Sequence, residues 1–174
     1  MLQNNQVPIN NHVNNTILRW ILICSGWFFI AAGFAGLFLP EAQGAAAPIC
    51  RPTPPDEIGP FYRPNAPVRS TIGKGYVLWG TVRDASNCRP VAGARIEFWQ
   101  AGPGGVYSDA YRATVFSDSK GRYRLETSAP PPYARRPPHI HILVDMRGYA
   151  GLITQHYPKG GRTLVQMDLV MARE

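Results

Sequence analysis

The chain has 174 residues, 45% of them hydrophobic, which suffices for one ordinary core but not for two independent domains beside a targeting segment. Its 17 glycines and 17 prolines are too many for a helical bundle and favour short strands joined by turns, so we expect an all-β domain. The net charge of +7 comes from dispersed arginines and lysines without a basic run. This distribution argues against a nucleic-acid partner and favours anionic small molecules.

Residues 1–44 have the composition of a targeting segment. The lone Arg19 leads into an uncharged run from Trp20 to Leu39, and small residues that suit signal peptidase follow around Gly44 and Ala45. A helix of about 20 residues rises about 30 Å, so the run could also serve as an uncleaved signal anchor. In both cases we expect the rest of the chain to be exported: periplasmic or secreted after cleavage, or facing outward from a membrane.

Two cysteines, Cys50 and Cys88, lie in the part that would be exported. An oxidising compartment favours a disulfide between them, and two unpaired small core residues are the alternative.

The exported part divides into a Pro-rich arm, residues 45–75, and a core, residues 76–174. Proline lacks the amide donor that a central strand needs, so the arm should wrap the domain in extended form. In the core, β patterns alternate with turn signals. We expect strands at 76–82, 94–100, 114–117, 121–126, 139–144, 152–155 and 163–171. Seven or eight short strands at this spacing predict a β-sandwich.

The sharpest chemical signal is the pair His139 and His141. Alternate residues of a strand point to one face, so both imidazoles can reach one metal ion while Ile140 packs on the opposite side. Tyr107 and Tyr133 lie in turn-rich segments from which their side chains can converge on the same place. The plain alternative is that each tyrosine is a half-buried aromatic with its hydroxyl in water.

Tyrosinate is a hard anionic donor that suits ferric iron, whereas zinc and copper favour Cys, His and carboxylates. Two tyrosinates and one hydroxide neutralise Fe(III), and a catechol dianion could replace the hydroxide and one tyrosinate without changing that sum. A zinc or copper site made of histidines alone, with His156 as a third ligand, is the alternative metal centre.

These motifs resemble the intradiol ring-cleavage dioxygenases, the family of the catechol 1,2- and protocatechuate 3,4-dioxygenases. The resemblance extends over most of the exported part. The segments that carry it are Glu57 to Tyr62, Gly80 to Asp84, Arg89 to Ala94, Phe98 to Gln100, Ser117 to Tyr123 and, most specifically, Arg136-Pro137-Pro138-His139-Ile140-His141.

The resemblance implies non-haem Fe(III) bound by Tyr107, Tyr133, His139 and His141. Tyr133 would be the ligand that leaves when a catechol chelates the metal, and it could take up a substrate proton. Arg136 would stabilise negative charge on the activated ring, and Gln155 would be a polar residue behind the pocket. Pro60 and Tyr62 would lie near the substrate mouth.

The implied reaction opens a catechol-type ring between its hydroxyl-bearing carbons with O₂, giving a muconate-type diacid. The chain departs from the family in lacking the long helical N-terminal region of cytoplasmic members, so their dimerisation cannot be assumed, and homo-oligomerisation stays open. Ala134-Arg135 also stand where compact relatives often have Pro-Gly. The rival function is a non-enzymatic binding sandwich of the carboxypeptidase-regulatory or transthyretin-like type, which shares the patterns within residues 76–126 but gives no reason for the tyrosine and histidine set.

Overall fold

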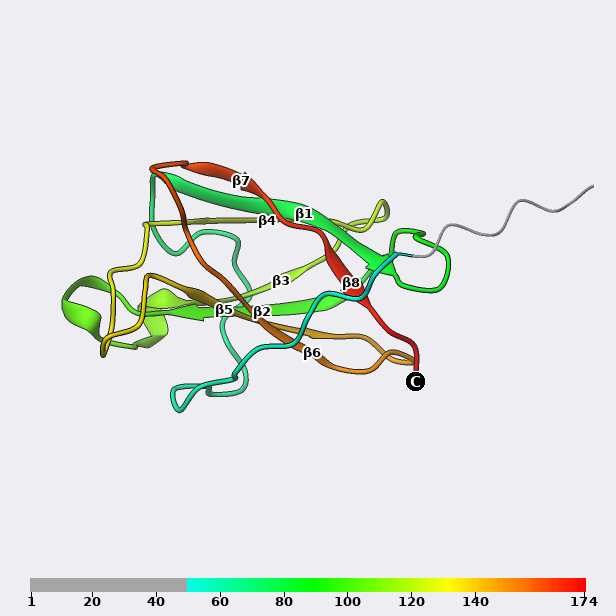
Figure 1. The fold of residues 1–174 in the computed structure, drawn as a ribbon, viewed down its shortest axis with the longest axis horizontal. Helices are drawn as coiled ribbons and strands as arrows, with labels where there is room; N and C mark the ends of the chain where they lie inside the picture. Colours follow the sequence, from blue (N-terminus) through cyan, green and yellow to red (C-terminus); the bar gives the residue numbers. More distant parts are fainter. Residues whose placement is uncertain (1–49) are drawn as a thin grey trace, which may run out of the picture. The chain divides into compact units, whose positions relative to one another are not determined.

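The computed structural model describes residues 50–174, and in them the chain folds as a two-layered β-sandwich (Figure 1). Within these residues eight strands form two sheets, which confirms the predicted fold class. The targeting segment predicted for residues 1–44 lies outside the described residues. The strands are β1 (Tyr76–Asp84), β2 (Arg95–Gln100), β3 (Arg112–Phe116), β4 (Arg122–Thr127), β5 (Ile140–Asp145), β6 (Leu152–His156), β7 (Leu164–Gln166) and β8 (Leu169–Met171).

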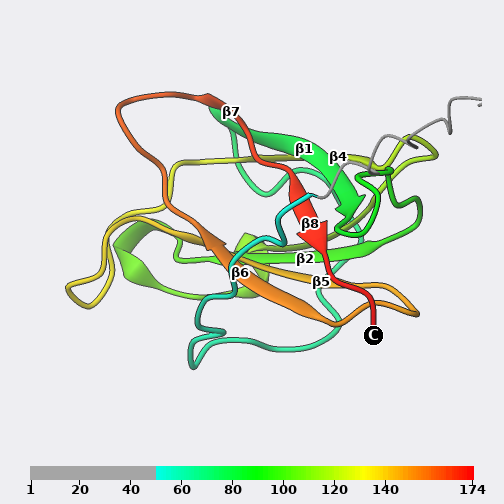
Figure 2. The same ribbon diagram turned by 45° about the vertical axis from the view of Figure 1, so that its right-hand side comes forward.

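One sheet has β1 at its centre, paired antiparallel with β4 and parallel with β7 and β8. The other has the order β3-β2-β5-β6, with all neighbours antiparallel. Both views in Figures 1 and 2 show the two sheets as separate layers. The β2–β3 connection, which includes short 3-10 turns at Pro103–Gly105 and Asp109–Tyr111, lies at the same end of the sandwich as the β4–β5 connection. That end carries the site described below.

The core lies between the layers and follows the period-2 pattern of the strands. In β1, Tyr76, Leu78 and Val82 are buried, whereas Trp79 is partly exposed on the outer face. Ile96 and Phe98 of β2 are completely buried, each with 0% of its surface exposed. Burial therefore alternates along β1, whereas β2 is buried on both faces.

The predicted strand 163–171 is two short strands, β7 and β8, which pair with β1 in the same parallel register and are separated at Met167 and Asp168. Met167 N donates to Trp79 O, and Tyr123 Oη donates to Met167 O. A Cβ at Gly80 would lie 1.9 Å from Met167 O, so only glycine allows this close approach. The Asp168 carboxylate accepts hydrogen bonds from Thr81 N and Arg83 Nε, so a side chain takes the place of a backbone acceptor between β7 and β8.

Residues 50 to 75 of the arm form no strand. Isolated backbone hydrogen bonds attach the arm to both sheets. Thr53 N donates to Val170 O, and Asp56 N donates to Ile153 O at 2.9 Å. A disulfide joins Cys50 at the start of the described arm to Cys88 in the turn after β1. No helix in residues 50–174 is long and apolar enough to cross a membrane.

A buried carboxylate connects the end of β1 to the C-terminal residues. Asp84 accepts hydrogen bonds from the backbone and hydroxyl of Ser86, from Tyr149 Oη and from the guanidinium of Arg173. These donors, the Ser86 hydroxyl first, hold the pKa of Asp84 far below its ordinary value of 3.8. The carboxylate is therefore charged and stabilising at neutral pH.

Candidate active site

Two histidines face the same side of the β3-β2-β5-β6 sheet. His141 lies in β5 between Trp99 of β2 and Gln155 of β6 in the sheet register. Its imidazole stacks on the Trp99 indole with 4.8 Å between ring centroids and 3° between planes. Ile140 lies in the core with no exposed surface, as the spacing predicts. The rings of His139 and His141 are 4.8 Å apart, edge to face, on the opposite side.

Both imidazoles can offer an unprotonated nitrogen. His139 Nδ1 lies 2.7 Å from Pro137 O. Because a carbonyl oxygen only accepts, Nδ1 carries the proton and Nε2 keeps its lone pair. Burial, and after it the neighbouring His139, lower the pKa of His141 to about 4. Neutral imidazole is the form that binds a metal ion.

Tyr107 brings a phenolic oxygen to these nitrogens from the β2–β3 connection. Its Oη lies 3.3 Å from Nε2 of His139 and 3.5 Å from Nε2 of His141. Burial raises the pKa of the Tyr107 phenol, and the positive charge of Arg136 opposes that effect. A bound metal cation would have to displace the proton, as a strong Lewis acid can.

Tyr133 approaches the same place from the β4–β5 connection. Its ring stands edge-on to Tyr107, at 5.5 Å and 87°, and edge-on to Phe61 at 5.4 Å. Phe61, from the arm, lies nearly parallel to Tyr107 at 4.3 Å. The arm therefore packs one aromatic ring against both tyrosines. Sequence reasoning did not single out Phe61, although it lies in the Glu57 to Tyr62 motif.

A tight turn places Tyr133 beside Arg136. Arg136 N donates to Tyr133 O at 2.7 Å, and Tyr133 N donates to Arg136 O at 3.2 Å. The two residues between them, Ala134 and Arg135, have φ of 45° and 68°. Residues other than glycine, Asn and Asp rarely adopt this left-handed backbone conformation, so the turn is strained. The turn therefore holds Tyr133 and Arg136, both proposed site residues, next to each other at the edge of the pocket.

A pocket of about 210 Å³ opens over these side chains. Its lining consists of Glu57, Gly59, Pro60, Phe61, Tyr107, Tyr133, Ala134, Arg136, His139 and His141. All four predicted metal ligands, Pro60 and Arg136 therefore share one cavity. Tyr62, predicted at its mouth, is not in this lining. Its hydroxyl donates to the buried Glu97 at 2.8 Å and its ring packs on Trp99, because a buried carboxylate needs a donor.

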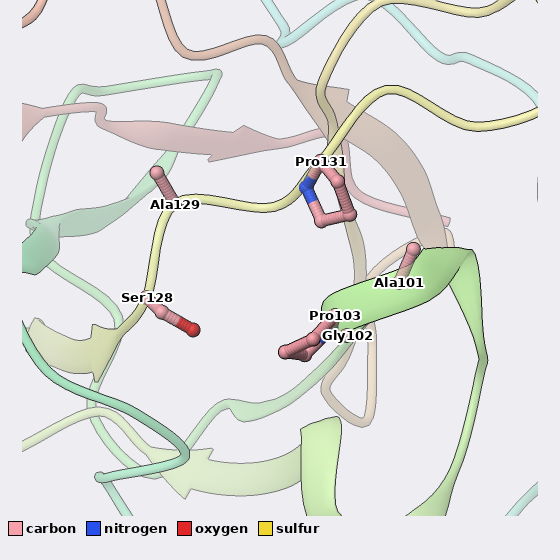
Figure 3. Close-up of a pocket in the computed structure, with 6 residues that line it drawn as sticks. All are labelled: Ala101, Gly102, Pro103, Ser128, Ala129 and Pro131. Carbon is pink, nitrogen blue, oxygen red and sulfur yellow. The ribbon is translucent and has the colours of Figure 1, made fainter.

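A second hollow, also of about 210 Å³, separates the loops that lead to the two tyrosines (Figure 3). Ala101, Gly102 and Pro103 lie on one side, on the way to Tyr107, and Ser128, Ala129 and Pro131 on the other, on the way to Tyr133. Its lining has no ionisable side chain, so it offers no obvious chemistry of its own.

Arg136 and Gln155 are hydrogen-bonded behind the pocket. Arg136 Nη2 donates to Gln155 Oε1 at 2.8 Å and to the hydroxyl of Tyr157 at 3.1 Å. Tyr157 was missed from the sequence. The signal that could have found it is its position two residues after Gln155, at the end of β6 and on the same side of the sheet.

The donor set fits ferric iron better than zinc or copper. No group of three or more His, Cys, Asp or Glu that could hold a metal occurs in the described residues. His156 pairs with Ile140 in the register, and its Nε2 lies 2.6 Å from the hydroxyl of the buried Tyr76. His156 therefore cannot be the third ligand of a zinc or copper site made of histidines alone. The donors available to complete the pair of imidazoles are phenols, which suit Fe(III).

Comparison with known proteins agrees with this geometry. A dioxygenase family profile matches residues 62–136. Chlorocatechol 1,2-dioxygenase of Pseudomonas putida is 32% identical over 146 residues, covering 64% of this chain and 56% of that protein. Hydroxyquinol 1,2-dioxygenase of Rhodococcus opacus is 33% identical, covering 65% of this chain and 48% of that protein. The chain thus spans about half the length of these curated relatives.

Solved structures show the same fold. The dioxygenase domain of a dioxygenase and carbohydrate-binding fusion from Streptomyces sp. SirexAA-E superposes with a TM-score of 0.64 at 26% identity, covering 71% of this chain and all of that one. Chlorocatechol 1,2-dioxygenase from Pseudomonas putida gives 0.58 at 25% identity, covering 66% and 70%. The profile match, these likenesses and the shared cavity of tyrosines and histidines make the chain similar to the intradiol ring-cleavage dioxygenases in fold and in the residues of its candidate site.

Proposed function

We propose that this protein is a non-haem Fe(III) dioxygenase that opens a catechol-type ring between its two hydroxyl-bearing carbons and forms a muconate-type diacid. The observation that carries the proposal is the position of Tyr107 Oη within 3.5 Å of the Nε2 atoms of both His139 and His141. Tyr133 lines the same pocket and would be the fourth protein ligand. Ferric iron in such a site supplies one kind of chemistry: it makes a chelated catecholate reactive toward O₂.

The chain's own residues then bind, orient and neutralise the substrate. The Oη of Tyr133 would hold the metal in the free protein and would accept a proton from an incoming catechol. The Arg136 guanidinium stabilises the negative charge on the ring. Phe61 and Pro60 give the pocket an apolar wall, which excludes water from the reacting carbons. Both atoms of O₂ end in the two carboxylates of the product.

The substrate belongs to the catechol class, and the basic surface favours a ring with an anionic substituent. Export is part of the proposal, supported by the uncharged run from Trp20 to Leu39 and by the bond between Cys50 and Cys88, since disulfides persist in oxidising compartments. Cell fractionation tests export: recovery of the protein with the cytoplasmic fraction would contradict it.

The visible spectrum of the purified, iron-loaded protein tests the reaction centre. We expect a broad tyrosinate-to-iron band that shifts to longer wavelength with one of catechol, protocatechuate, hydroxyquinol or 3-chlorocatechol, followed by O₂ uptake and diacid formation. Tyr107→Phe should lose most of the band, while Tyr111→Phe, which changes a tyrosine in the same connection, should keep it. A colourless parent protein that retains no iron would refute the proposal.

A further inference from the structure

Arg136 is held by Gln155 and Tyr157, and Tyr157 is itself supported by the arm. We propose that Tyr157 and Asp56 form a positioning relay for Arg136. The relay rests on the proposed function, because it explains how the arginine is aimed at the reacting ring. It adds two residues, one in the arm and one after β6, to those that the reaction would need.

The guanidinium is held through a single nitrogen. Arg136 Nη2 carries two hydrogens, and its two acceptors are Gln155 Oε1 at 2.8 Å and Tyr157 Oη at 3.1 Å. Within residues 50–174, Nε and Nη1 of Arg136 have no hydrogen-bond acceptor, and the side chain lines the pocket. The guanidinium is planar, so fixing Nη2 leaves the other donors free for a ligand in a defined plane.

Tyr157 is itself fixed by a charged acceptor. Its hydroxyl lies 3.0 Å from Asp56 Oδ2 and 3.1 Å from Gln155 Oε1. The hydroxyl has one proton, and the hydrogen bond to the ionised carboxylate is the stronger of the two. Gln155 Oε1 already accepts from Arg136. The proton of Tyr157 therefore points to Asp56, and its lone pairs face Arg136.

The arm in turn fixes Asp56. Asp56 N donates to Ile153 O of β6, and Asp56 Oδ1 accepts from Glu57 N at 2.7 Å. Gln155 Nε2 donates to Glu57 O at 2.6 Å, so both acceptors of the Arg136 guanidinium depend on residues 56 and 57. The arm therefore contributes more than the pocket wall, because its Asp56 carries the negative charge that is linked to Arg136 through Tyr157.

Tyr157→Phe removes one oxygen and with it both hydrogen bonds of the relay. Without the acceptor, Nη2 keeps a single partner, Gln155, and the guanidinium can rotate. We expect kcat for ring cleavage to fall by about tenfold or more, because a displacement on the order of 1 Å at the reacting centre costs about a hundredfold. KM should change by less than kcat, and iron content should stay that of the parent.

Asp56→Asn provides a second variant, which keeps the shape of the side chain but removes its charge. It should give a smaller fall in kcat than Tyr157→Phe. Tyr76→Phe is the matched control: it removes a tyrosine hydroxyl that also bonds a β6 residue, His156, but on the core face of the sheet. Its kcat should equal that of the parent.

A measurement without iron separates the relay from the reaction. In the metal-free full chain, NMR of labelled arginine gives the rate of rotation about the Nε–Cζ bond of Arg136. We expect rotation several-fold faster in Tyr157→Phe and unchanged in Tyr76→Phe. If the iron-loaded parent opens no catechol ring, the proposed function fails, and faster rotation in Tyr157→Phe would still support the relay. Parent-like rotation, or parent-like kcat, in Tyr157→Phe would overturn it.

Discussion

Replacing Gly59 with alanine tests how closely the arm must approach the histidines. Gly59 has φ of +71°, and a Cβ placed there would lie 2.9 Å from Cε1 of His141. Ordinary contacts begin near 3.4 Å, so the ring or the arm must move by about 0.5 Å. The ring cannot tilt freely, because it stacks on Trp99 at 4.8 Å. We therefore expect two separate costs, one in the backbone and one at the site.

The backbone cost is the left-handed conformation, about 1 kcal/mol for a residue with a Cβ. Gly93→Ala has the same cost without the contact, since Gly93 has φ of +75° and no atom lies within 4 Å of its Cβ. In thermal unfolding of the metal-free proteins, the left-handed conformation should lower the free energy of unfolding by a similar amount in both variants. Any larger loss in Gly59→Ala is due to the contact with His141. In a ferric titration followed by the tyrosinate band, only Gly59→Ala should bind more weakly, by about tenfold or 1.4 kcal/mol. Equal iron affinity in the two variants would refute the reasoning.

Three further predictions concern stability. Asp84→Asn should be less stable by about 2 kcal/mol at pH 7 in urea unfolding, because the folded-state pKa of the carboxyl is depressed. The stabilisation is present above the ordinary pKa of 3.8 and is lost as pH falls toward the folded-state value, so the difference should shrink below about pH 4, and a constant difference would contradict it. Replacing Cys50 and Cys88 with serine should cost about 4 kcal/mol, since the disulfide spans 38 residues, and a reduced parent should match the variant in denaturant unfolding. The double variant Ala134→Asn, Arg135→Gly should raise the melting temperature by a few degrees, because these residues suit two successive positive φ angles; an unchanged value would mean that the turn is not strained.

The two histidines were predictable because they lie on one strand. Strand alternation is a local property of the chain, so the sequence already placed His139 and His141 on one face and Ile140 in the core. Tyr107 and Tyr133 stood out in turn-rich segments, the resemblance to a family gave them a role as metal ligands, and the structure brings both into the same pocket.

Tyr62 and Tyr157 show where local reasoning ended. Tyr62 adjoins two pocket residues in the sequence, yet its hydroxyl bonds the buried Glu97 of β2, 35 residues away. Tyr157 carries no motif, and its role comes from Asp56, 101 residues earlier in the chain. Both assignments depend on which distant polar group lies opposite the hydroxyl, which no local pattern specifies.

The sequence by itself determined the β-sandwich, the common face of His139 and His141 and the family resemblance, because composition, period-2 alternation and short motifs act over a few residues. The tertiary structure alone decided that the region predicted as one strand, 163–171, breaks where Met167 lies against Gly80. It also decided that His156 faces Tyr76, away from the pocket, and that Phe61 of the arm packs against both tyrosines. The physical reason is that sheet register and the pairing of buried polar groups are settled between segments far apart in the chain.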